Sequence, residues 1–317
     1  TVQLFEGIRL AMVQIAAQKL KSFFSLLGVI IGVMFLIVVV SVVEGMDRYI
    51  EEDFSSQVFG LNTVTLRRWP SVNINTDPEE WRARLRRPRI TEDDALALRT
   101  ALATPARIAV QSNGGGEIVA ENGRSASNVS FTAASAEIFR IRDWVVERGR
   151  AFTDREDETG TAVVVLGVDA ADALFESLDP LGRTVRIQGF PYRVIGVLEE
   201  QGSLFGQSLD NVLVAPAGSP LRSLVAPRGY VDEVIAQALD PAQVRTLQAE
   251  IEGIMRVRHR LRPTEDNDFV AETADDSLSF WDRISTILFT ALPGLVAISL
   301  VVGGIVIMNI MLVSVME

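Results

Sequence analysis

The sequence predicts an α+β membrane protein in which two long transmembrane helices flank one large folded domain. The first observation is that residues 22–43 and 284–316 contain no charged side chain. A helix needs about 20 mainly apolar residues to cross the hydrocarbon core of a bilayer, and each run reaches that length. The second observation is that the polar region between the runs is far too long for a loop. The third is that this region mixes strand patterns with helical ones, which is typical of an α+β domain.

Charge is concentrated in the central region. The whole chain carries a formal net charge of −11. The flanks 1–46 and 283–317 hold three acidic and four basic residues, which leaves 38 acidic and 26 basic residues in 47–282, a net charge of −12. Phosphate backbones are bound by basic faces, so this balance argues against nucleic acid as a partner. The absence of cysteine excludes thiolate catalysis and cysteine metal sites.

The charges beside the first span, 22–46, predict its orientation. Arg9, Lys19 and Lys21 precede it, whereas acidic residues dominate the segment that follows. By the positive-inside rule the N-terminus is cytoplasmic, the domain over 47–282 is extracytoplasmic, and the second span, 283–317, returns the chain to the cytoplasm. The apolar run exceeds the core of a signal peptide, so we expect a retained anchor.

The segment before the first span and both spans contain residues that predict contacts with the membrane surface or with other helices. Residues 1–21 show apolar positions at helical spacing, which predicts an amphipathic helix that lies on the cytoplasmic membrane surface or against a neighbouring protein. Both spans are expected to extend beyond the bilayer as helical stalks. Small residues let transmembrane helices approach closely, and a buried Asn hydrogen-bonds across helices. The candidate helix-packing residues are Gly28, Gly32, Gly303, Gly304 and Asn309.

Two β-α-β patterns enclose the extracytoplasmic domain. The first consists of a strand at 62–66, a helix at 91–102 and a strand at 107–111. The second consists of a strand at 231–238, a helix at 240–257 and a strand at 268–272. Thr91 caps the first helix, and Asp240 with Pro241 opens the second. The two units predict one split α/β subdomain over 47–115 and 219–282.

Short strand patterns dominate residues 116–218, which we expect to form an inserted, mainly-β subdomain. Strands are predicted at 117–120, 127–132, 162–166, 184–188, 192–198 and 211–214, with one helix at 168–177. The consecutive glycines Gly114, Gly115 and Gly116 predict a turn at the entry to this subdomain. They lack the Lys-Ser/Thr pair of a phosphate loop.

Three polar groups are weighed as sites, and none is favoured. Five arginines near Trp81 lie in a segment predicted to be irregular, and we favour a solvated loop over a contact to lipid headgroups or a partner; they are Arg82, Arg84, Arg86, Arg87 and Arg89. The acids of 154–158 lie in a predicted turn, where a solvated loop is favoured over a general acid/base pair. His259, the single histidine, has no carboxylate or serine partner nearby. We therefore predict no catalytic, cofactor-binding or metal site.

Several stretches form a recognisable series along the chain. Lys19–Ser22 is followed by Leu27–Val33 in the first span, and Met308–Glu317 closes the second span. Between the spans lie Glu147–Phe152, Val165–Gly167, Asp179–Gly182 and Val194–Val197. In order and spacing these stretches resemble the first-span signature, the extracytoplasmic core pattern and the end of the second span of the MacB/FtsX-type ABC transporter permeases.

This resemblance implies a permease subunit in the bacterial plasma (inner) membrane that couples ATP hydrolysis by an ABC ATPase to export or mechanical work outside the membrane. It implies a second permease copy, an extracytoplasmic adaptor and membrane lipid as partners. It also implies that this chain binds no cofactor, since ATP and Mg belong to the ATPase. Such permeases have four spans, so we expect the third and fourth elsewhere and a segment that couples to the ATPase from Glu317 onward. A two-span receptor with an extracytoplasmic ligand-sensing domain stays open as the alternative.

Overall fold

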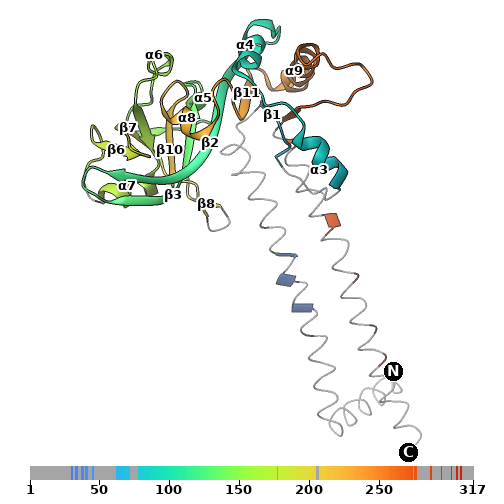
Figure 1. Cartoon of the computed structure of the whole chain (residues 1–317). Coiled ribbons are helices and arrows are strands. Elements are labelled where there is room, and N and C mark those ends of the chain that lie inside the picture. Colours follow the sequence, from blue (N-terminus) through green and yellow to red (C-terminus); the bar gives the residue numbers. More distant parts are fainter. Residues whose placement is uncertain are drawn as a thin grey trace, which may run out of the picture. The chain divides into compact units, whose positions relative to one another are not determined.

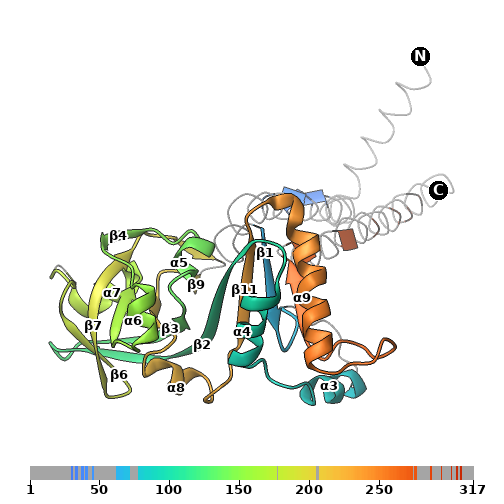
Figure 2. The ribbon, with the colours of Figure 1, turned by 90° about the horizontal axis from the view of Figure 1, so that it is seen from above.

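The computed structural model describes residues 62–71, 78–176, 178–204 and 207–273 and, outside these ranges, isolated positions. Contacts within the chain divide it into two units: Thr1–Glu51 with Ser279–Glu317, and Glu52–Leu278. We call the second unit the central domain. It holds almost all the described residues, and Figures 1 and 2 show it from two sides.

The two predicted transmembrane helices fall in the first unit, mostly outside the described residues. The positions described there are all helical; they are Ile30, Val33, Met34, Ile37, Val38, Val40, Ser41, Gly45, Thr286, Ile287, Gly294, Val301, Ile305 and Met308. Within the described part of the chain, no helix combines the length and the apolar character that a membrane crossing requires. The spans, the stalks and the N-terminal helix over 1–21 therefore stay predictions.

Ten described strands of the central domain form one continuous sheet. Along its main path the order is β12–β1–β11–β2–β3–β10–β5–β7–β4, and β6 pairs with both β2 and β7. The strands are β1 (Thr63–Arg67), β2 (Ala106–Ala120), β3 (Ser125–Ala134), β4 (Val146–Gly149), β5 (Val163–Leu166), β6 (Thr184–Ile187), β7 (Phe190–Leu198), β10 (Val212–Pro216), β11 (Glu233–Ala238) and β12 (Val270–Thr273). A separate hairpin joins β8 (Ser203–Leu204) to β9 (Gln207–Ser208).

The first part of the sheet, β12–β1–β11–β2, contains two interlocked β-α-β units. The chain leaves β1, forms α4 (Glu92–Ala101) and returns as β2, so that β11 lies between the two strands. It then leaves β11, forms α9 (Val244–Arg258) and returns as β12 beyond β1. This is the split β-α-β topology, and every neighbouring pair in it is antiparallel. The strands and helices that the sequence predicts here are confirmed.

The two helices lie side by side and cover one face of these strands (Figure 2). Leu247, Ile251 and Met255 of α9 recur every four residues and are buried against Leu98 of α4 and Leu66 of β1. Burying a large aliphatic side chain stabilises a fold by about 1.5–3 kcal/mol, so this stripe fixes α9 on the sheet. Thr91 caps α4 as predicted.

β2 joins both parts of the domain, and here one prediction is wrong. Gly114, Gly115 and Gly116 do not form a turn, because they lie inside this 15-residue strand. A Cβ at Gly114 would lie 2.6 Å from Val225 Cγ1 of α8 (Leu221–Val225), and one at Gly116 would lie 3.1 Å from the ring of Phe131. The glycines therefore leave room for groups that pack across the strand.

The remaining strands form the β-rich part. β10 runs parallel to β3, and β7 runs parallel to β5, while the other pairs are antiparallel. The predicted helix is α7 (Val168–Phe175), which buries Leu174 and Phe175 against this part. Ile138 and Phe139 of α5 (Ile138–Ile141) belong to a further buried cluster that also contains Ile235 of β11. The hydrophobic core thus runs through both parts of the domain, as the sheet does.

Two short helices occupy segments that the sequence predicts as irregular or as a turn. α3 (Pro78–Leu85) forms within the arginine-rich segment, and α6 (Asp154–Glu158) forms within the acidic one. In α6 the cap explains the difference: Thr153 Oγ1 accepts from the backbone N–H of Glu156, whose carboxylate accepts from the N–H of Thr153. Such a capping box stabilises the first turn of a helix even when the helix is short.

Candidate functional site

The described part of the central domain begins and ends at one edge of its sheet. β1 and β12 are antiparallel neighbours, and Val64 lies opposite Thr273. β12 is the outermost strand of the main path. The chain segments that precede β1 and follow β12 therefore meet the domain at neighbouring points.

A set of side chains, which we call the β12 lock, holds the chain directly after β12. Thr273 Oγ1 accepts from the backbone N–H of Asp276, and Asp276 Oδ2 accepts from the N–H of Thr273 at 3.0 Å. From α9, Arg245 donates to Asp276 Oδ1 at 2.8 Å and Gln248 donates to Oδ2 at 3.0 Å. Although burial acts to raise it, these hydrogen bonds hold the pKa of the Asp276 carboxyl below its ordinary value. α9 is thus tied to the point where the chain leaves the sheet.

At the other end of β1, two side chains hold the arginine-rich segment. Arg68 Nε donates to the carbonyl of Arg87 and Arg68 Nη2 to that of Leu85, both at 2.7 Å. Trp69 Nε1 donates to the carbonyl of Arg84 at 3.2 Å. The end of α3 and the turn after it are therefore fixed on the end of β1, which corrects the prediction of an irregular loop. The side chains of Arg82, Arg86 and Arg89 are exposed, as predicted for a solvated segment.

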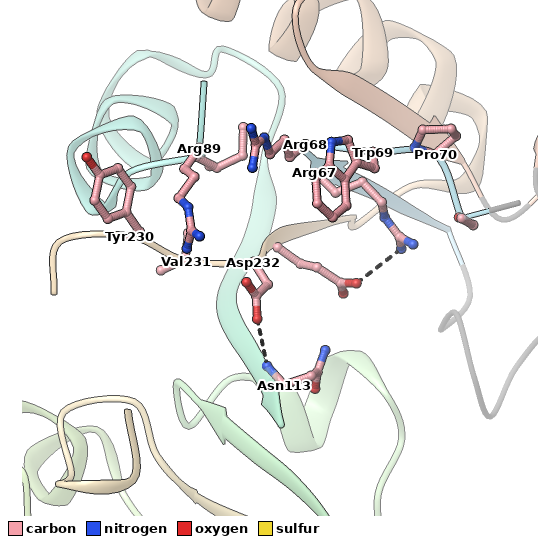
Figure 3. A pocket seen from close by; sticks show the side chains of 12 residues that line it. Arg67, Arg68, Trp69, Pro70, Arg89, Asn113, Tyr230, Val231 and Asp232 are labelled. Atoms are coloured by element: carbon pink, nitrogen blue, oxygen red, sulfur yellow. Dashed lines mark hydrogen bonds and ion pairs between the residues drawn. The ribbon is translucent and has the colours of Figure 1, made fainter. Parts of the chain in front are cut away.

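A pocket of about 410 Å³ lies beside this junction, and Figure 3 shows its side chains. We call it the arginine pocket. Its walls come from the ends of β1 and β11, the segment before α4 and the middle of β2. It is lined by Arg67, Arg68, Trp69, Pro70, Ser71, Arg89, Ile90, Asn113, Tyr230, Val231, Asp232 and Glu233.

One glutamate that lines this pocket faces two arginines, of which Arg67 lines the pocket and Arg142 does not. Glu233 Oε1 lies 3.6 Å from Arg67 Nη2, and Glu233 Oε2 lies 4.0 Å from Arg142 Nη2. Arg142 Nη2 also donates to Gln111 Oε1 at 3.2 Å. Burial lowers the pKa of the Arg142 guanidinium. The negative charge of Glu233 acts to raise this pKa, and the positive charge of Arg67 acts to lower it. The three charged side chains are only 13–17% exposed, so their charges are poorly screened by water.

His259 does have carboxylate partners, which corrects the sequence prediction. Its Nδ1 lies 2.6 Å from Asp268 Oδ1, and its Nε2 lies 4.0 Å from Asp94 Oδ2. Arg258 donates to Asp94 Oδ1 at 2.7 Å, and the ring of Phe269 packs edge-on against the imidazole. This cluster ties α4 and α9 to the segment before β12. Its geometry is that of a structural hydrogen-bond network around the ion pair of Arg258 and Asp94.

The acids of 154–158 also have structural partners. Glu156 pairs with Arg150, whose two terminal nitrogens lie 2.7 and 2.8 Å from its carboxylate oxygens. That contact, with help from Thr153, lowers the pKa of the Glu156 carboxyl to about 2 even though burial acts against it. Asp157 accepts from the backbone N–H of Gly218 at 2.9 Å. α6 is thereby fastened to the loop after β10.

The residues predicted for helix packing and for ATPase coupling lie outside the described residues. They are Gly28, Gly32, Gly303, Gly304, Asn309 and Glu317. Their roles stay predictions. Within the described part of the chain, no group of three or more His, Asp and Glu side chains is placed to hold a metal ion.

Comparison with known families decides the affiliation of this fold. A model of the MacB-like periplasmic core domain matches residues 22–254. The chain belongs to this family. Its MacB-like core thus includes the whole sheet except β12, together with most of α9.

Curated relatives extend the similarity over almost the whole chain. The macrolide export ATP-binding/permease protein MacB of Bdellovibrio bacteriovorus is 31% identical over 316 residues, which is 99% of this chain and 47% of that protein. The pyoverdine export ATP-binding/permease protein PvdT of Pseudomonas aeruginosa is 29% identical over 319 residues, or 99% of this chain and 45% of that protein. The chain spans about half the length of the curated relatives it matches.

Solved structures show the same fold. The periplasmic region of MacB from Actinobacillus actinomycetemcomitans superposes with a TM-score of 0.57 and 19% identity, covering 73% of this chain and 96% of that one. The extracellular domain of the ABC-type transporter YknZ from Gram-positive bacteria gives a TM-score of 0.51 and 20% identity, covering 67% and 100%. The MacB-like α/β fold of the central domain is thereby confirmed.

Proposed function

We propose that this chain is the permease part of a MacB-type ABC transporter, in which ATP hydrolysis by an ABC ATPase drives movement of the central domain on the outer side of the membrane. The family match over residues 22–254 carries the proposal. ATP and Mg belong to the ATPase, and the permease part performs no catalysis. The relatives named for macrolide and pyoverdine export make efflux of a small molecule the first substrate class to test.

The geometry of the central domain supports a mechanical role. Because β1 and β12 pair, two helices that flank the domain would act on one edge of the sheet. Because the sheet and its core run through both parts, a displacement at that edge would move the whole domain. The β12 lock supports the same role, since it ties α9 to the exit point of the chain.

The proposal places the protein in the bacterial plasma membrane with a cytoplasmic N-terminus, and it includes a second permease copy and an extracytoplasmic adaptor as partners. The family match does not favour the two-span receptor, because the relatives are named as export permeases.

The test is co-purification of the full-length protein, in nanodiscs, with the ABC ATPase encoded beside it or joined to it. We expect a stable complex of two permeases and two ATPase units, and ATP turnover that changes when the permease is present. An ATPase variant without its phosphate-loop lysine is the control, since it should assemble without turnover. Failure to associate in several lipid compositions would contradict the proposal.

A further inference from the structure

The arginine pocket carries positive charge in a domain of strongly negative net charge. Three arginines line it against two acids, Asp232 and Glu233, whereas residues 47–282 as a whole have a net charge of −12. Arg142 adds a further positive charge behind Glu233. A local reversal of charge inside a concave surface attracts anions by focusing the field there.

Among the described residues, each inner guanidinium group keeps one buried nitrogen without an acceptor, although Arg142 Nη2 donates to Gln111 Oε1. Arg67 and Arg142 share Glu233 at 3.6 and 4.0 Å, which is longer than the 2.7–2.9 Å typical of a charge-assisted hydrogen bond. In the described part of the chain, the Nε atoms of both arginines are buried without a hydrogen-bond partner. A buried donor without an acceptor is destabilising, and a bound anion would relieve that at Arg67, which lines the pocket.

The other lining groups divide into those already engaged and those turned to the pocket. Arg68 donates to two backbone carbonyls, and Asp232 Oδ2 accepts from the N–H of Asn113 at 3.0 Å (Figure 3). Arg89 instead lies over the ring of Tyr230, with 5.9 Å between its guanidinium carbon and the ring centroid. Trp69 donates its indole N–H to the carbonyl of Arg84, and its ring lies under the guanidinium of Arg68 at 4.8 Å. Trp69 and Tyr230 still expose 46% and 38% of their surface. One exposed cation and two partly exposed aromatic rings thus border the pocket.

We propose that the arginine pocket binds a small organic anion. Its carboxylate or phosphate lies between Arg67 and Arg89, and its flat apolar body lies between Trp69 and Tyr230. The pocket volume of about 410 Å³ is in the range of small-molecule sites. This binding does not depend on the proposed transport function, and the test below measures binding alone.

The test uses the full chain in detergent or nanodiscs and titrates it calorimetrically with naphthalene-2-carboxylate. Naphthalene-2-carboxamide is the neutral probe of the same shape, and inorganic phosphate is the anion without a ring. We expect the carboxylate to bind at least about tenfold more tightly than the amide, because the amide cannot neutralise the arginines. We also expect phosphate to compete with it.

Two variants in the pocket and one control variant outside it assign the binding to this pocket. Arg89→Gln should weaken binding of the carboxylate about tenfold. Arg186→Gln, which removes the same charge from an exposed position on β6, should leave it unchanged. Tyr230→Leu should weaken the carboxylate but not phosphate, because only the carboxylate carries a ring. An unchanged unfolding midpoint shows that each variant is folded.

Three results would each overturn the inference. They are equal affinity for carboxylate and amide, equal affinity of the Arg89→Gln and Arg186→Gln variants, and no saturable binding of carboxylate or phosphate up to about 10 mM.

Discussion

Arg245 of α9 and Asp276, three residues beyond β12, form an ion pair with 2.8 Å between Nη1 and Oδ1. The same carboxylate belongs to a capping box with Thr273. One side chain therefore starts the helical turn after β12 and fastens it to α9. Together with the pairing of β12 and β1, this contact would transmit movement of the chain beyond β12 to the core of the domain.

Removal of this carboxylate tests the β12 lock. Asp276→Ala should lower the free energy of unfolding by about 1–2 kcal/mol, because it removes a helix cap together with a partly exposed ion pair. Denaturation of the full chain, followed by tryptophan fluorescence, measures the change. Asp172→Ala, at an exposed position in α7, is the matched control and should have little effect. Equal effects of the two substitutions would show that the lock contributes nothing.

Glu156 predicts a pH dependence of stability. Its pKa is about 2 in the folded protein, against an ordinary value of 4.5, mainly because Arg150 donates to it. A lowered folded-state pKa stabilises the fold above pH 4.5, and this contribution is lost as the pH falls from about 4.5 toward 2. Glu156→Gln should therefore reduce the loss of stability across that window. Unfolding midpoints at pH 5 and at pH 2.5 measure this, with Glu158→Gln as the control. A steeper or unchanged loss in Glu156→Gln would refute the assignment.

Two glycines should respond to alanine in opposite directions. A Cβ at Gly167 would lie 2.1 Å from the backbone oxygen of Asp210, whereas nothing lies within 4 Å of a Cβ at Gly253, an exposed position in α9. Gly167→Ala should destabilise the domain by more than about 2 kcal/mol, because backbone must move. Gly253→Ala should stabilise it by about 0.5–1 kcal/mol through helix propensity. Thermal unfolding of both variants decides the matter, and a stable Gly167→Ala protein would contradict this packing.

The continuous sheet predicts that the central domain moves as one body. The chain has no cysteine, so Leu96→Cys in α4 and Arg186→Cys in β6 would provide the labelling sites, one in each part of the domain. The distance distribution between two spin labels should keep its mean and width when nucleotide is added to the complex with the ATPase. A pair with both labels at Arg186 of two permease copies should report any relative movement of the copies. A nucleotide-dependent shift within one domain would reveal a hinge that the sheet topology does not provide.

Local patterns predict much of this fold. A continuous apolar run identifies β5, and the alternation of apolar residues identifies β6 and β7. Thr91 marks the start of α4, and Asp240 marks the 3-10 turn that leads into α9, because capping depends on neighbours in the chain. The same reasoning fails at Gly114 to Gly116. Glycine is read as a turn residue, but here it makes room for Val225 and Phe131, which come from other elements.

The roles of individual polar and glycine residues also depend on contacts between segments that are distant along the chain. The sequence does not show the partners of His259, because both depend on the tertiary fold. Asp268, nine residues later, lies 2.6 Å from its Nδ1, and the packing of α4 on α9 brings Asp94 within 4.0 Å of its Nε2. The glycine of the motif Val165–Gly167 is recognisable by resemblance, but its role becomes clear only from the close approach of the Asp210 carbonyl.

By itself the sequence determined the family resemblance, the two long apolar segments and most strands and helices, because these depend on composition and local periodicity. The tertiary structure alone decided that β1 and β12 are neighbours, that β2 joins both parts of one sheet, and that Arg67, Arg89 and Glu233 share a pocket. The reason is physical. Strand pairing and pocket formation depend on which distant segments bury their apolar faces together, and a one-dimensional pattern shows which residues seek burial without showing against which partner.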